Sequence, residues 1–84
     1  MSFFNLGITM LNSSNSEGAI EAFKQSIAAD PNYSESYYEL GRLLIAKDAT
    51  MAEGIQMLKK YLQIGKKQDQ KDISKALIDA LEKK

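Results

Sequence analysis

The chain has 84 residues, enough for one domain near the small end of what folds alone. Its apolar share of 44% and charged share of 26% are ordinary for a globular protein and exclude a disordered one. Eleven basic residues balance eleven acidic ones, so no overall field favours nucleic acid or an anionic membrane.

Several residue types that carry chemistry are missing. The chain has no cysteine and no histidine, so disulfides, thiolate metal sites and the usual nucleophile–base pairs of hydrolases are unavailable. No acidic calcium-loop pattern and no glycine-rich phosphate loop is present. No apolar run approaches the roughly 18 residues of a membrane span, and the first residues lack the basic region of a signal peptide. We therefore expect a cytoplasmic protein that is not an enzyme, has no cofactor or metal and has no membrane partner.

The first two predicted helices cover about residues 2–12 and 17–29. Apolar side chains there recur at steps of three and four residues, which places them on one helix face rather than alternating across a strand. Ser14 and Glu17 have the spacing of a capping box that opens the second helix. Pro31, the only proline, ends this first unit.

The next two predicted helices, about residues 34–47 and 51–64, follow the same pattern. Asn-x-x-Glu at 32–35 and Thr-x-x-Glu at 50–53 predict a capping box ahead of each helix. No strand is expected anywhere in the chain.

A fifth helix is predicted at about residues 70–83. Its apolar residues form one stripe and its charges lie elsewhere, with Asp69 as the expected N-cap and lysines at the end, where the helix dipole favours cations. Such a helix is suited to cover the end of the preceding units.

The sequence repeats itself at a period of 34 to 35 residues. An aromatic-x-x-Leu-Gly pattern at residues 3–7 recurs 34 residues later, and the apolar pattern of residues 19–27 recurs after 35. This period is typical of a stacked array of helical hairpins.

Glycines stand beside the apolar stripe of both first helices. Glycine inside a helix costs about 1 kcal/mol relative to alanine, so a close packing contact must offset that cost. Gly7 and Gly41 in the first helices and Ala19 and Gly54 in the second are expected to let the two backbones of each hairpin approach closely.

The residues at these repeated positions resemble the tetratricopeptide repeat. The resemblance in the first unit is carried by Phe3, Leu6, Gly7, Met10, Ala19, Phe23, Ser26 and Pro31, and in the second by Tyr37, Leu40, Gly41, Leu44, Gly54 and Leu58. It implies an all-α, right-handed superhelical fold of five helices in a single domain. Repeat one covers about residues 1–33, repeat two about 34–68 and a capping helix about 69–84.

The second unit departs from the family pattern near its end. The family usually has a small residue where Tyr61 stands and a proline where Lys66 stands. We interpret unit two as the last full repeat, with Tyr61 filling room that a third unit would otherwise occupy.

In the family, the first helix of each unit lines a concave surface that receives peptides. Carried over position by position, the resemblance implies a peptide-binding groove formed by Phe4, Asn5, Ile8, Leu11, Asn12, Glu35, Tyr38, Glu39, Arg42 and Ile45. Helical geometry gives independent support, because Tyr38, Arg42 and Ile45 fall on a face rotated away from the core stripe. We expect these side chains to form an exposed anchor site for another protein.

The expected ligand is an apolar segment, either an amphipathic helix or an extended strip. Relatives that hold a terminal carboxylate use Lys and Asn where this chain has Phe4, Ile8 and Glu39, so binding of such chaperone tails is predicted to be absent. Arg42 would read an acid on the ligand. The alternative is that Arg42 pairs with Glu39 or Glu35.

Other functions compete with peptide binding. Residues 1–58 carry three basic and seven acidic groups, whereas residues 59–84 carry eight and four, so net charges of −4 and +4 could join two copies end to end. Self-association as a weak homodimer or scaffold, or a place within a longer array, is therefore the alternative to a monomer awaiting a ligand. Nucleic-acid binding is not expected, because only Tyr61 lies among the lysines.

Overall fold

The computed structural model describes residues 2–82, which contain five α-helices and one short 3-10 turn joined by loops. The elements are α1 (Phe3–Asn12), α2 (Ser16–Ala29), α3 (Ser34–Leu44), η1 (Asp48–Thr50), α4 (Met51–Ile64) and α5 (Gln68–Glu82). No strand occurs in this range, so the predicted all-α class is confirmed. Residues 1, 83 and 84 of the predicted units lie outside the described residues.

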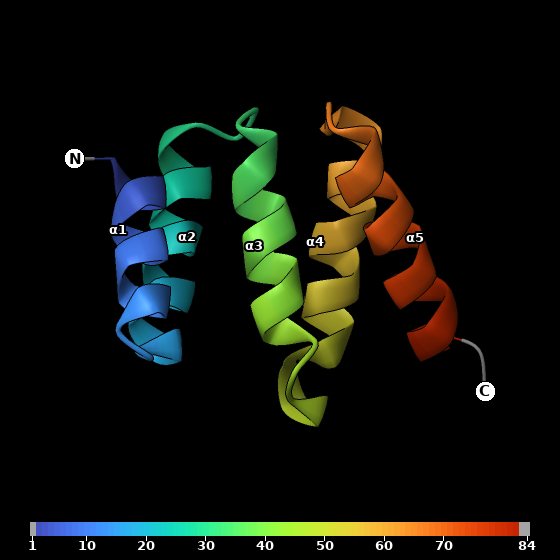
Figure 1. Ribbon diagram of the computed structural model, residues 1–84, viewed down its shortest axis with the longest axis horizontal. Coiled ribbons are helices and arrows are strands. Elements are labelled where there is room, and N and C mark those ends of the chain that lie inside the picture. Colours follow the sequence, from blue (N-terminus) through green and yellow to red (C-terminus); the bar gives the residue numbers. More distant parts are fainter. Residues whose placement is uncertain (1, 83–84) are drawn as a thin grey trace.

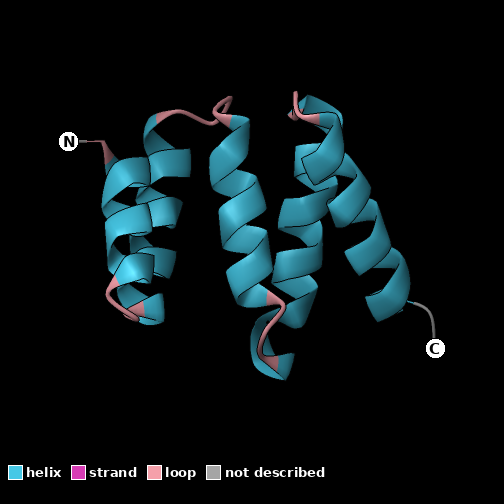
Figure 2. Cartoon of the chain, in the orientation of Figure 1, coloured by secondary structure: helices cyan, strands magenta, loops and turns pink. Residues whose placement is uncertain are grey.

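The helices form a row of two hairpins followed by a single helix. Each helix packs on its successor, α1 on α2, α2 on α3, α3 on α4 and α4 on α5. In Figure 1 the α1–α2 hairpin lies at one end of the row and α5 at the other, and Figure 2 shows the loops at alternate ends of the helices. This arrangement is the predicted stack of helical hairpins closed by a fifth helix.

The second helices of the two units match closely in length and register. Both α2 and α4 have 14 residues, and their first and last residues are 35 positions apart. The α3 and α5 helices begin 34 positions apart. The structural repeat therefore has the period that the sequence predicts.

The helix α3 ends at Leu44, three residues earlier than predicted. The Thr50 hydroxyl donates a hydrogen bond of 2.6 Å to the Leu44 carbonyl, which satisfies one of the carbonyls left open at the helix end. The 3-10 turn η1 then leads directly into α4.

The predicted capping boxes are wrong. The N-cap of α2 is Asn15, whose side-chain oxygen accepts a hydrogen bond of 3.0 Å from the Gly18 N–H, while Ser14 has a φ of 62° in the preceding turn. Thr50 stands at the N-cap of α4 but uses its hydroxyl on Leu44 instead.

The other two predicted helix starts also differ. The N-cap of α3 is Tyr33, which makes no side-chain cap, and the backbone N–H of Asn32 donates to the carboxylate of Asp30. The helix α5 begins at Gln68, so Asp69 lies in its first turn and is not the N-cap. Polar side chains near a helix start can bond to several backbone groups, so their spacing alone does not identify the cap.

The hydrophobic core consists of two clusters, one for each hairpin. The first is built around Ala19, Phe23, Leu40 and Leu44, where α3 packs on the first hairpin. The second lies between α3, α4 and α5 and contains Tyr37, Tyr38, Ile55, Leu58, Tyr61 and Ile78. Because α3 contributes to both clusters, it joins the two units.

The predicted close approach of two helix backbones at glycine is confirmed in unit two. In unit one the glycine contacts a side chain instead. A Cβ atom on Gly41 would lie 3.1 Å from the Gly54 carbonyl oxygen, and one on Gly54 would lie 2.9 Å from the Gly41 carbonyl. A Cβ on Gly7 would meet the ring of Phe23 at 2.5 to 2.8 Å, and Ala19 is not among its nearest neighbours. The first hairpin therefore uses its glycine to admit a ring and the second to bring two backbones together.

Candidate protein-interaction surface

The ten predicted groove residues lie on α1, on α3 and at the residue that follows α3. Asn5, Asn12 and Arg42 are exposed. Phe4, Ile8, Leu11, Glu35, Glu39 and Ile45 are half-buried, and Tyr38 is buried. Their placement on the first helices agrees with the sequence, but their exposure varies more than the sequence indicated.

Tyr38 is not the exposed anchor that the sequence predicted. Its side chain is only 4% exposed, and its ring centroid lies 5.3 Å from that of Tyr61. The guanidinium carbon of Arg42 lies 5.4 Å from the same ring centroid, which is within the range of a cation–π contact. Burial raises the pKa of the Tyr38 hydroxyl. Tyr38 therefore belongs to the core between α3, α4 and α5.

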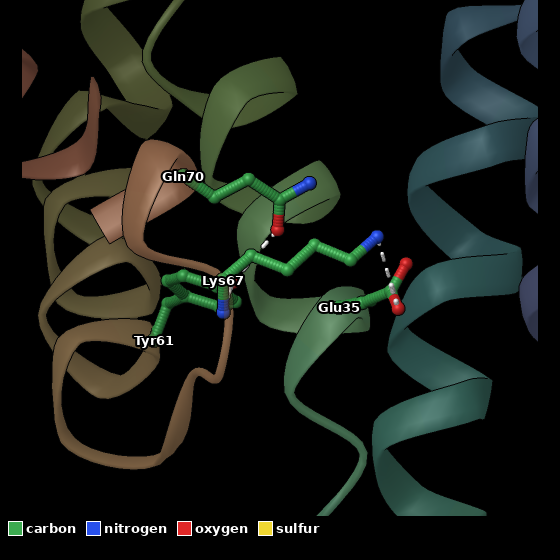
Figure 3. A network of polar contacts seen from close by, with 4 residues as sticks. All are labelled: Glu35, Tyr61, Lys67 and Gln70. Atoms are coloured by element: carbon green, nitrogen blue, oxygen red, sulfur yellow. Dashed lines mark hydrogen bonds and ion pairs between the residues drawn. The ribbon is translucent and has the colours of Figure 1, made fainter. Parts of the chain in front are cut away.

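Tyr61 explains the burial of Tyr38. The Tyr61 side chain is fully buried, and its hydroxyl donates a hydrogen bond of 2.7 Å to the side-chain oxygen of Gln70 on α5 (Figure 3). The backbone N–H of Lys67 donates to the same hydroxyl at 3.4 Å. Tyr61 thus fills the space against α5, as the departure from the family pattern predicted.

Charged groups of the predicted groove are paired within the chain. Arg42 lies 3.6 Å from Glu39, so the sequence alternative of pairing between these two residues is confirmed. The Lys67 amine, just before α5, reaches to 3.7 Å from the Glu35 carboxylate (Figure 3). Burial raises the pKa of Glu39, an effect that the Arg42 guanidinium offsets in part and the Glu35 carboxylate reinforces.

A buried hydrogen bond between two serines joins the units. The hydroxyls of Ser26 on α2 and Ser36 on α3 lie 2.7 Å apart, and both side chains are buried. By the offsets of the helices, Ser26 corresponds to Tyr61 and Ser36 to Gln70. Both joints between successive units are therefore closed by a hydrogen bond at equivalent positions, a feature that sequence reasoning missed because it treated Ser26 only as a small residue.

A cavity of about 560 Å³ lies where α1 begins and α2 ends. It is lined by Ser2, Phe3, Phe4, Asn5, Ser26, Ala29, Asp30 and Tyr33. The rings of Phe4 and Tyr33 meet edge to face, with centroids 5.1 Å apart and an interplanar angle of 80°. Phe4 and Asn5 belong also to the predicted groove, but no motif in the sequence indicated a cavity.

Within residues 2–82, no group of three or more acidic side chains is arranged to hold a metal ion. None of the helices described here is long and apolar enough to cross a bilayer.

Comparison with known proteins identifies the repeats. A tetratricopeptide repeat family model matches residues 22–72, which is more than half of the chain and runs from α2 into the first residues of α5. No curated protein and no solved structure gives a significant match. The matched range covers both joints between successive units, Ser26 with Ser36 and Tyr61 with Gln70. The chain therefore belongs to the tetratricopeptide repeat family, whose repeats generally serve as protein–protein interaction modules.

Proposed function

We propose that this chain binds a segment of another protein along the face shared by α1 and α3. The observation that carries the proposal is the mixture of side chains on α1. Phe4, Ile8 and Leu11 are half-buried apolar residues, and Asn5 and Asn12 beside them are exposed. A surface with apolar area flanked by polar groups is the usual composition of a binding site for a protein segment.

The α3 half of this face differs from the α1 half. Tyr38 is buried in the core, so the side chains that α3 presents on this face are mainly the charged ones of Glu35, Glu39 and Arg42. The Arg42 side chain is 53% exposed and makes one ion pair among the described residues, which leaves guanidinium donors for a carboxylate on the ligand. We expect a ligand that lays an apolar stretch on α1 and presents an acidic residue toward Arg42.

Selection from a peptide library tests this proposal. The chain is immobilised, bound peptides are recovered, and their contact surface is mapped from backbone amide chemical shifts. We expect the largest shifts on α1 and α3. The double variant Asn12→Arg/Arg42→Ala changes only exposed residues of this face and should weaken binding by about tenfold or more, which is about 1.4 kcal/mol.

The matched control places arginines elsewhere on the surface. Gln25→Arg/Gln56→Arg alters exposed residues of α2 and α4 and should leave peptide binding unchanged. Shifts confined to α2 and α4, or equal losses in the two double variants, would show that the face is assigned wrongly.

Self-association is a second candidate, favoured by apolar side chains exposed at both ends of the row. Phe3 on α1 is 43% exposed and Ile73 on α5 is 45% exposed. End-to-end contact between copies would cover both residues. Sedimentation velocity at increasing concentration should then show a dimer that Ile73→Lys abolishes, whereas a monomer at every concentration would exclude this candidate.

A further inference from the structure

We propose that the cavity between the start of α1 and the end of α2 is a binding pocket for an aromatic side chain that is followed by a basic residue on a partner protein. The proposal rests on the proposed function in one respect, namely that the ligand is a protein segment. The pocket itself lies at the end of the α1–α3 face and shares Phe4 and Asn5 with it.

The internal repeat indicates what the pocket accepts. Ser26 lines the cavity, and its counterpart 35 residues later is Tyr61. Phe4 also lines the cavity, and its counterpart 34 residues later is Tyr38. In unit two the Tyr61 ring lies on Tyr38 with centroids 5.3 Å apart. In unit one the smaller Ser26 takes the place of Tyr61 and Phe4 is paired with Tyr33 instead, so a ring supplied by a ligand at the cavity would add to this pair.

The lining also suits an aromatic guest. Phe3 and Tyr33, which both line the cavity, are 43% and 38% exposed, which leaves apolar ring surface in contact with water. A ring placed among Phe3, Phe4 and Tyr33 would bury this surface and form edge-to-face contacts. The volume of about 560 Å³ lies within the usual range of ligand pockets.

Asp30 supplies the preference for a cation. Within residues 2–82 it is the only charged residue that lines the cavity, and it takes part in no ion pair there. Because Asp30 lines the same cavity as Phe3, Phe4 and Tyr33, a lysine or arginine next to a ring bound there could reach its carboxylate.

The wider charge distribution agrees with this choice. Residues 2–33 contain the acids Glu17, Glu21 and Asp30 but only one basic residue, Lys24, so this end of the chain is negative. A second copy of the chain is a poor source of the guest, because the one aromatic residue of the sequence that is directly followed by a basic residue, Phe23 before Lys24, is fully buried.

Capped dipeptides test the ring and the charge separately. The full chain, labelled with ¹⁵N, is titrated with acetyl-Tyr-Lys-amide, acetyl-Tyr-norleucine-amide and acetyl-Leu-Lys-amide at one ionic strength. We expect acetyl-Tyr-Lys-amide to shift the amide signals of Asn5, Ser26 and Tyr33. It should bind at least about fivefold more tightly than either of the other two dipeptides. Equal binding of all three, or no shift at these amides, would overturn the proposal.

Three single variants sharpen the result. Ala29→Ile enlarges a side chain of the lining and should narrow the pocket and weaken binding about tenfold. Ala28→Ile makes the same change at the neighbouring exposed position outside the lining and should have no effect. Asp30→Asn retains an oxygen that can accept from the Asn32 N–H, so folding is preserved while the preference for lysine over norleucine disappears.

The two proposals fail in different ways. If library peptides shift residues along α1 and α3 but the dipeptides leave Asn5, Ser26 and Tyr33 unmoved, the pocket is refuted and the binding face stands. If the dipeptides bind with the expected preference but library peptides contact α2 and α4, the pocket stands and the binding face is refuted. Equal effects of Ala28→Ile and Ala29→Ile would exclude the pocket.

Discussion

Gly41 is a residue whose missing side chain determines how closely two helices pack. A Cβ atom there would lie 2.8 Å from the side chain of Leu58, which is fully buried, and 3.1 Å from the Gly54 carbonyl oxygen. Neither neighbour can move without separating α3 from α4. The gain in helix propensity from alanine, about 1 kcal/mol, is therefore opposed by overpacking.

We expect Gly41→Ala to lower the free energy of unfolding by about 1–3 kcal/mol, measured by urea denaturation. Gln56→Ala is the control, because its side chain is exposed on α4. Its effect should be much smaller. Equal losses in the two variants would contradict the close approach of the backbones at Gly41.

Glu39 makes the stability of the fold depend on pH. Burial raises the pKa of its carboxyl, and Arg42 at 3.6 Å offsets only part of that effect. An acid with a raised pKa in the folded state holds its proton more tightly there, so its stabilising contribution is present at low pH and is lost as the pH rises through the folded pKa. Ionised Glu39 at neutral pH therefore costs stability relative to a neutral side chain.

Glu39→Gln should accordingly be more stable than the natural protein at neutral pH, with the difference shrinking as the pH falls toward 4.5, the ordinary value for this group. Urea denaturation at several pH values measures this. Glu21→Gln, at an exposed position, serves as the control for the loss of one negative charge. A difference between Glu39→Gln and the natural protein that does not vary with pH would contradict the role of burial.

At the scale of the elements, the start of α2 is set by one asparagine. Asn15 accepts a hydrogen bond from the Gly18 N–H, and Ser14 lies in the turn before it with a left-handed φ of 62°. We expect Asn15→Ala to lower the free energy of unfolding by about 1 kcal/mol and Ser14→Ala to change it by less than about 0.5 kcal/mol. Thermal unfolding of both variants distinguishes this cap from the predicted capping box, in which Ser14→Ala would be the costly change.

Ser74 is a defect in the packing of α5. Its hydroxyl is fully buried and has no hydrogen-bond partner among residues 2–82, and the counterpart of this residue 34 positions earlier is the core residue Leu40. An unsatisfied buried hydroxyl costs about 1–3 kcal/mol, so Ser74→Ala should raise the free energy of unfolding by about 1 kcal/mol or more. A lower unfolding midpoint in that variant would mean that the hydroxyl has a partner.

The existence and order of the helices were predictable because the three- and four-residue apolar periodicity is local. Helix starts were not, since Ser14, Asn15 and Thr50 all have polar side chains that can bond to several backbone groups. The choice among those partners depends on the path of the turn. The end of α3 differs from the prediction for the same reason, because the Thr50 hydroxyl donates to the Leu44 carbonyl.

Across the whole molecule, exposure of the binding face was the least predictable property. The helical face that contains Tyr38 follows from sequence spacing, and the placement of the predicted residues on the first helices could be anticipated from the repeat. The burial of Tyr38 depends on Tyr61 of α4, whose hydroxyl donates a hydrogen bond to Gln70 of α5. The cavity beside Phe4 likewise results from Ser26 on another helix. Contacts between distant segments of the chain have no local pattern.

The serine pair between the units offers a test of cooperation across the molecule. Removing one hydroxyl leaves the other buried without its partner, so Ser26→Ala and Ser36→Ala should each cost about 1–3 kcal/mol. The double variant should cost less than the sum, because it leaves neither group unsatisfied. A double-mutant cycle by urea denaturation measures the coupling, and strict additivity would show that the two hydroxyls do not interact.

The unequal size of the two joints restricts how this chain could be lengthened. At the first joint two short hydroxyl side chains meet, whereas at the second a phenol meets a long amide. Duplicating residues 34–67 ahead of α5 would bring Tyr61 of the earlier copy against Ser36 of the next one, a mismatched pair. An added unit would therefore require a glutamine-sized residue where it begins, or a serine-sized residue where the preceding unit ends.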